Sequence, residues 1–215
     1  MEPKINYQLV LEQELRKIAA EGRRPTLLLH GCCAPCSSYV LEYLNRIFAI
    51  TLLYYNPNIS PAAEYEHRAA EAGRLIREMG IDSRLVVVPY DASEYREAVR
   101  GLENEPEGGR RCEACFRLRL GKAAQMAKEG GFDYFTTTLS ISPLKDSQLL
   151  NRIGKELSEV YGVPYLFSDF KKKNGYRRSV ELSAIYGLYR QDYCGCAYSK
   201  AERERKKREE GSCII

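Results

Sequence analysis

Seven of the eight cysteines stand in three short groups, and thiols at such spacings are suited to metal or redox chemistry. The groups are His30-Gly-Cys-Cys-Ala-Pro-Cys36, Arg111-Cys-Glu-Ala-Cys115 and Tyr193-Cys-Gly-Cys196. An isolated cysteine is most often a small buried residue. These cysteines instead lie next to Pro, Gly and Arg rather than inside apolar runs. Packing therefore explains them poorly, and a metal or redox site is favoured.

The spacings leave the kind of metal open. A Cys-x-x-Cys pair supplies two of four tetrahedral ligands, so one pair from each of the first two groups suits structural zinc or an iron-sulfur cluster. Zinc would use four thiols and leave three unexplained, whereas a cluster beside a second redox or open metal site uses all seven, which favours iron. The Cys194-Gly195-Cys196 spacing would hold two sulfurs close enough for a strained, easily reduced disulfide, which predicts an electron relay.

The chain alternates β-rich apolar runs with stretches of helical spacing, and this alternation predicts the scaffold that positions the thiols. Strands are expected at 26–30, 49–55, 84–89, 134–139 and 163–167, and helices at 37–48, 61–79, 93–100, 112–129, 147–161 and 176–190. The pattern predicts an α/β fold, a mostly parallel sheet with helices on both faces, with ligands beyond the carboxyl ends of the strands. The first strand-to-helix turn carries no glycine-rich phosphate loop, so nucleotide binding has no direct support.

Length, charge and hydropathy limit the class of protein. The 215 residues, 44% of them hydrophobic, suffice for one α/β domain, which we place at 1–199, followed by a charged tail at 200–215. No stretch approaches the roughly 20 apolar residues of a membrane helix, and the first residues lack the layout of a secretion signal. We therefore expect a cytoplasmic protein with no membrane partner. The net charge of +4 permits an anionic partner, and one basic loop is suited to gripping RNA phosphates through Lys171, Lys172, Lys173, Arg177 and Arg178.

The chain resembles the QueH-type epoxyqueuosine reductases from Leu28-Leu-His-Gly-Cys-Cys-Ala-Pro-Cys-Ser-Ser38 nearly to its end. Other matching segments are Tyr55-Asn-Pro-Asn-Ile59, Arg111-Cys-Glu-Ala-Cys115, Phe135-Thr-Thr-Thr-Leu139 and Tyr189-Arg-Gln-Asp-Tyr-Cys-Gly-Cys-Ala-Tyr-Ser199. The resemblance implies reduction of the epoxide of epoxyqueuosine, at the wobble base of certain tRNAs, to an alkene. The expected partners are that tRNA and an electron donor that the sequence does not identify. The resemblance further implies a [4Fe-4S] cluster, an adjacent iron or zinc ion, and a fold similar to the adenine nucleotide α-hydrolase (HUP, Rossmann-like) group.

The resemblance also implies roles for individual cysteines. It assigns cluster ligation to Cys32, Cys33, Cys112 and Cys115, and a catalytic, redox-active pair to Cys194 and Cys196. Cys36 then remains as a candidate ligand of the second metal, which also needs an oxygen ligand, and Asp91 just after the third expected strand is a candidate for it. Cys213 receives no role.

Two other interpretations stay open. A tRNA-thiolating enzyme shares a related fold and can use a cluster, but it consumes ATP, so the missing phosphate loop counts against it. A non-catalytic zinc protein that binds RNA would use the cysteines only to stabilise its fold. Iron, zinc and sulfide content distinguishes the zinc protein from the reductase.

Overall fold

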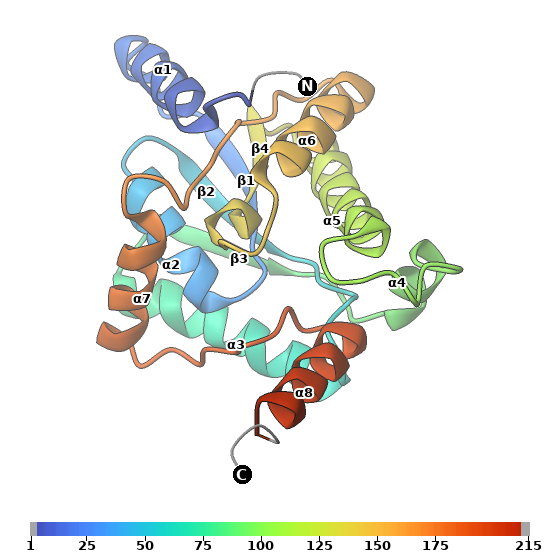
Figure 1. Ribbon diagram of the computed structural model, residues 1–215. Coiled ribbons are helices and arrows are strands. Elements are labelled where there is room, and N and C mark those ends of the chain that lie inside the picture. The colour runs from blue at the N-terminus through green and yellow to red at the C-terminus, as the bar shows by residue number, and fades with distance from the viewer. Residues whose placement is uncertain (1–3, 212–215) are drawn as a thin grey trace.

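Four parallel strands form the central sheet of the computed structural model, which describes residues 4–211 (Figure 1). The strands are β1 (Thr26–His30), β2 (Ala49–Tyr54), β3 (Ser83–Val87) and β4 (Tyr134–Thr137), in the order β3-β2-β1-β4. Leu29 of β1, for example, pairs with Leu52 on one side and Thr136 on the other. Because every pairing is parallel, the carboxyl ends of all four strands meet at one edge, as the sequence predicts.

Helices cover both faces of this sheet (Figure 1). Leu27 and Leu29 of β1 pack into one apolar core, and Leu28 between them packs into the other, as expected for a strand buried on both faces. The predicted α/β class is confirmed. The helices are α1 (Tyr7–Ala20), α2 (Ala34–Leu44), α3 (Ala62–Met79), α4 (Ala92–Ala98), α5 (Arg110–Glu129), η1 (Thr138–Ile141, a 3₁₀ helix), α6 (Ser147–Tyr161), α7 (Gly175–Ile185) and α8 (Ala197–Gly211).

The strand expected at 163–167 is reduced to a single bridge between Phe135 and Tyr165. Two backbone bonds form there, from Phe135 N to the Pro164 carbonyl and from Leu166 N to the Phe135 carbonyl. The Leu166 carbonyl then accepts the Thr136 hydroxyl at 2.8 Å instead of a backbone donor. Proline also removes one N–H from the segment, so the ladder cannot extend.

The tail expected at 200–215 is helical as far as residue 211, where it forms most of α8. Glu202 of this helix pairs with the buried Arg111 at 2.8 Å, and Arg203 and Lys207 both pair with Asp192. The described part of the tail is therefore attached to the domain. Cys213 lies outside the described residues. Within residues 4–211, no helix combines the length and the apolar character that crossing a membrane requires.

Candidate metal centre

The first cysteine group occupies the turn between β1 and α2. Cys33 is the N-cap of α2, and Cys36 lies in its first turn, near the positive end of the helix dipole. The sulfurs of Cys32, Cys33 and Cys36 all lie within 4.8 Å of one another, and those of Cys32 and Cys33 are 3.8 Å apart. Hydrogen bonds from the Cys33 and Cys36 thiols lower the pKa of Cys32, whereas bonding to Cys32 raises the pKa of Cys36. The turn is therefore suited to hold a metal, which would displace the remaining thiol protons.

The second and third groups meet at the start of α5. Cys112 and Cys115 stand in the first turns of α5, and the Cys112 sulfur accepts the backbone N–H of Gly108 at 3.2 Å. Cys115 shares a buried cluster with Cys196, which is only 6% exposed. Burial is the first cause that raises the pKa of both thiols, to about 12 for Cys115. The fold thus joins two cysteine groups that lie some 80 residues apart in the sequence.

A cavity of about 370 Å³ connects the first group to the third. Its wall includes three sets of residues: the thiols of Cys32, Cys33, Cys36 and Cys194, the cations Arg68, Arg119 and Lys145, and the aromatic rings of Tyr176 and Tyr193. The β1–α2 turn that carries the first thiols starts at the carboxyl end of a parallel strand, where the sequence predicts ligand binding.

Two of the cations in this cavity have sulfur neighbours and no carboxylate. The Lys145 ammonium lies 3.3 Å from the Cys194 sulfur. Desolvation alone would lower the pKa of Lys145, but the Cys194 sulfur more than offsets this and raises it. Arg119 is 1% exposed, with Nη1 3.9 Å from the Cys115 sulfur and Nη2 donating to Asn56. Within residues 4–211, neither cation has a carboxylate at ion-pair distance.

These surroundings fit an iron-sulfur group. The thiolate ligands of such a group give it negative charge, which two cations without carboxylate partners would balance. The Nε of Arg119 is buried and has no hydrogen-bond partner among residues 4–211, so one donor is left over for a bound group. The Nη1 of Arg119 lies 3.9 Å from the Cys115 sulfur, and Arg119 lines the cavity together with Cys32, so it is close to both cysteine groups.

The Cys-Gly-Cys segment has a conformation that requires its glycine. Gly195 has a φ of +115°, and an added Cβ would lie 2.9 Å from Nη1 of the buried Arg68. The same Nη1 donates to the Cys194 carbonyl at 3.4 Å, and the guanidinium stacks 5.4 Å from the centre of the Tyr193 ring. Arg68 therefore fixes the position of Cys194 at the cavity. Cys194 and Cys196 are free thiols in the structure.

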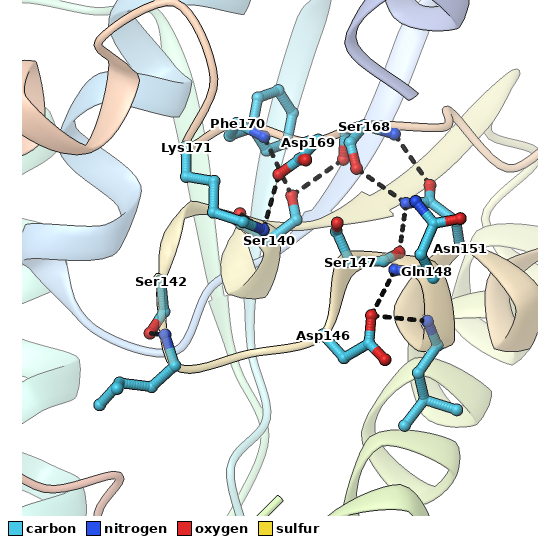
Figure 2. A network of polar contacts seen from close by, with 12 residues as sticks. Ser140, Ser142, Asp146, Ser147, Gln148, Asn151, Ser168, Asp169, Phe170 and Lys171 are labelled. Carbon is cyan, nitrogen blue, oxygen red and sulfur yellow. Dashed lines mark hydrogen bonds and ion pairs between the residues drawn. The ribbon is translucent and has the colours of Figure 1, made fainter. Parts of the chain in front are cut away.

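A buried polar network fixes the turn that carries Lys145 (Figure 2). On the η1 side, Ser140 bonds to the Ser168 hydroxyl at 3.1 Å, and Asn151 of α6 bonds to the backbone N and O of Ser168 at 2.9 and 2.8 Å. On the α6 side, Asp146 caps the helix by accepting from the Gln148 amide at 2.8 Å. Sequence reasoning missed Lys145. The available signal was its place in the loop after β4, at the ligand-binding edge of the sheet.

The structure does not bring Asp91 to the thiols. Asp91 is the exposed N-cap of α4 and accepts from the Ser93 amide at 2.7 Å. It neither lines the cavity nor belongs to the group formed by Cys32, Cys33 and Cys36.

The basic loop is largely neutralised by neighbouring carboxylates. The ion pairs are Lys171 with Asp169, Lys173 with Glu12, Arg177 with Glu181, and Arg178 with both Glu42 and Glu181. Lys172 is exposed and has no ion-pair partner among the described residues. Tyr176, in the first turn of α7, lines the cavity. RNA binding by this loop stays a prediction.

Known proteins resemble this chain over most of its length. A family model described as "Epoxyqueuosine reductase QueH" matches residues 27–202. The protein of that name from Streptococcus pyogenes is 49% identical over 200 residues, covering 91% of this chain and 78% of the relative. The protein of the same name from Staphylococcus epidermidis is 41% identical over 202 residues, which cover 91% of this chain and 85% of the relative. The one from Thermotoga maritima is 37% identical over 190 residues, which cover 86% of this chain and 95% of the relative.

Among solved structures, the chain is similar to "U34-tRNA thiolase NcsA from Methanococcus maripaludis with its [4Fe-4S] cluster". The TM-score is 0.48 at 13% identity, and the match covers 92% of this chain and 74% of that one.

Proposed function

The chain belongs to the QueH family of epoxyqueuosine reductases and is an oxidoreductase, and from this premise we propose that it converts epoxyqueuosine at the tRNA wobble position into queuosine. The reaction breaks both carbon–oxygen bonds of the epoxide, forms a carbon–carbon double bond and releases the oxygen as water. It consumes two electrons and two protons. The observation that carries the proposal is one cavity lined by thiols of two cysteine groups and by two cations, Arg119 and Lys145, that have no carboxylate partner among the described residues.

The proposed cofactors follow the cysteine groups. We assign a [4Fe-4S] cluster to Cys32, Cys33, Cys112 and Cys115, and a second iron or zinc ion to Cys36. The cluster assignment is supported by Arg119, which lies 3.9 Å from the Cys115 sulfur and lines the cavity with Cys32 and Cys33. Asp91 is not used, because it caps α4 away from these thiols. When bound, the cluster would pass electrons one at a time, and the second metal would act as a Lewis acid toward the epoxide oxygen.

The third cysteine group fits the role of a two-electron store. Oxidation of the Cys194 and Cys196 thiols to a disulfide releases two electrons and two protons, which equals the demand of the reaction. Cys194 lines the cavity and Cys196 is buried behind it, so Cys194 is the sulfur that faces the substrate. Lys145 holds a proton on Nζ beside Cys194, and we assign it the protonation of the departing oxygen.

The tRNA would approach through the mouth of this cavity. Tyr176 lines the cavity and stands in the first turn of α7, within the basic segment 171–178, so phosphate contacts made by this segment would lie next to the site. The modified base would leave the anticodon stack to reach the thiols. The electrons for the reaction would come from a separate protein or a small reductant.

The test compares Cys36→Ala and Cys112→Ala with wild type, all purified and reconstituted anaerobically. Iron, sulfide and absorbance report the cluster, and mass spectrometry of digested epoxyqueuosine tRNA reports turnover. We expect Cys112→Ala to lose both cluster and turnover, and Cys36→Ala to lose turnover while keeping most of the cluster absorbance. Equal cluster loss in the two variants would refute this division of roles. If wild-type protein with a full cluster forms no queuosine in the presence of a reductant, the proposed function is refuted.

A further inference from the structure

The three most buried arginines near the cysteines differ in how their charge is balanced. Arg68 pairs with Glu64 at 2.7 Å, and Arg111 pairs with Glu202 at 2.8 Å. Arg119 is 1% exposed and has no carboxylate partner among residues 4–211. A guanidinium stays protonated in proteins, so burial cannot neutralise it by removing the proton. Its charge needs an anion that the described carboxylates do not supply.

The neighbours of the Arg119 guanidinium include a cysteine sulfur and an amide oxygen, but no carboxylate among the described residues. Its Nη1 lies 3.9 Å from the Cys115 sulfur, and its Nε is buried without a partner. Desolvation works against the cation, but the charges of Cys115, Cys194 and Cys32 outweigh it and raise the pKa of Arg119. These thiols are the groups that would supply the balancing anion once a bound metal removes their protons.

We propose that Arg119 is the counter-ion of the iron-sulfur cluster and raises its reduction potential. The inference rests on the proposed function, which supplies the cluster. Reduction adds one negative charge to the cluster, so a fixed neighbouring cation stabilises the reduced form more than the oxidised form. The low dielectric around a buried guanidinium strengthens this effect, and its unpartnered Nε–H is available as a donor.

Asn56 positions this guanidinium relative to the first cysteine group. Its side-chain oxygen accepts from Arg119 Nη2, and its side-chain nitrogen donates to the Gly31 carbonyl at 2.9 Å. Asn56 is fully buried, two residues after the end of β2. One amide therefore links the α5 cation to the backbone of the turn that carries Cys32.

The experiment is an anaerobic redox titration of the reconstituted protein, followed by electron paramagnetic resonance, with iron and sulfide measured on each sample. The variants are Arg119→Met, which removes the charge, and Arg119→Lys, which keeps it. The matched control is Arg117→Met, because Arg117 stands two residues away on α5 with an exposed side chain. We expect a more negative midpoint in Arg119→Met, a smaller shift in Arg119→Lys and none in Arg117→Met.

A second variant keeps the test decisive if Arg119→Met fails to fold or to hold the cluster. Asn56→Asp leaves Arg119 in place and gives it a carboxylate partner, so the midpoint is again expected to become more negative. An Arg119→Met or Asn56→Asp protein with full iron and the wild-type midpoint would overturn the inference. Failure of the proposed function has a different signature: wild-type protein then holds no cluster, or holds a full cluster with a measurable midpoint and forms no queuosine.

Discussion

At the scale of single residues, Lys145 carries the sharpest prediction about turnover. Its ammonium lies 3.3 Å from the Cys194 sulfur and lines the cavity. Lys145→Met removes the proton while keeping an unbranched apolar stem, so single-turnover reduction of epoxyqueuosine tRNA should slow about 10²-fold, the lower range for a lost general acid. Iron content should stay at the wild-type level. Lys155→Met, on the exposed face of α6, is the control. Wild-type rates in Lys145→Met would exclude proton delivery by this residue.

Sequence predicts residues whose role depends on type and spacing, and it misses those whose role depends on burial. The cysteine groups are visible because their spacing is local. In the sequence, Arg119 and Lys145 look like any other basic residues. Only the fold shows that Arg119 is buried and that neither cation has a carboxylate partner among the described residues. Asp91 lies away from the thiols for a topological reason. The third strand is at the edge of the sheet in the order β3-β2-β1-β4, so its end lies two strands from the β1 turn that carries the thiols.

At the scale of elements, the contact between α6 and the segment after it depends on Gly154. An added Cβ there would lie 2.4 Å from Cε1 of the buried Tyr165 ring, which packs 5.1 Å from the ring of Phe135. Gly154→Ala should therefore lower the free energy of unfolding by about 1–3 kcal/mol, the usual cost of overpacking. Urea denaturation measures the change.

Gly121→Ala in α5 is the matched control, because its nearest new neighbour, Leu157 Cδ2, is 4.0 Å away. There alanine should stabilise the helix by up to about 1 kcal/mol. Equal effects of the two substitutions would show that helix propensity, rather than the Tyr165 contact, determines the response at Gly154.

Periodicity predicts the elements that bury a regular apolar face, and it fails where side chains replace the backbone pattern. The helix α1 was not predicted, although its buried Leu11, Leu15 and Ile18 have helical spacing and Asn6 caps its start through the Leu9 amide. The strand expected at 163–167 has the right composition. Its ladder is nevertheless interrupted by the Thr136 hydroxyl, which no propensity reveals.

At the scale of the whole molecule, the parallel sheet explains why cysteines from distant segments meet. The turn after β1 brings the first group to the cavity that Cys194 also lines, and Cys115 of α5 packs in one buried cluster with Cys196. Arg111 attaches α8 to the start of α5. Its guanidinium donates to the Glu103 carbonyl, pairs with Glu202 of α8 and lies 4.6 Å from the Tyr198 ring. Alternation predicts the sheet, but the docking of α8 depends on ion pairs that composition alone does not place.

The tRNA binding proposed above requires particular cations near the cavity, because a net charge of +4 over 215 residues is small. Lys172 is the best candidate in the basic loop, because the other four cations predicted there are already paired with carboxylates. Lys172→Ala should weaken tRNA binding and reduce the slope of log affinity against log salt by about one, as for one lost phosphate contact.

The control for this measurement is Lys155→Ala. Lys155 is equally a surface lysine, but it stands on α6, which lies apart from α7 in the molecule (Figure 1). Binding curves for the tRNA at several KCl concentrations, with wild type and both variants, give the slopes. A slope unchanged in Lys172→Ala would place the tRNA backbone on another face. A slope equally reduced in Lys155→Ala would mean that binding follows total charge rather than a defined contact at the mouth of the cavity.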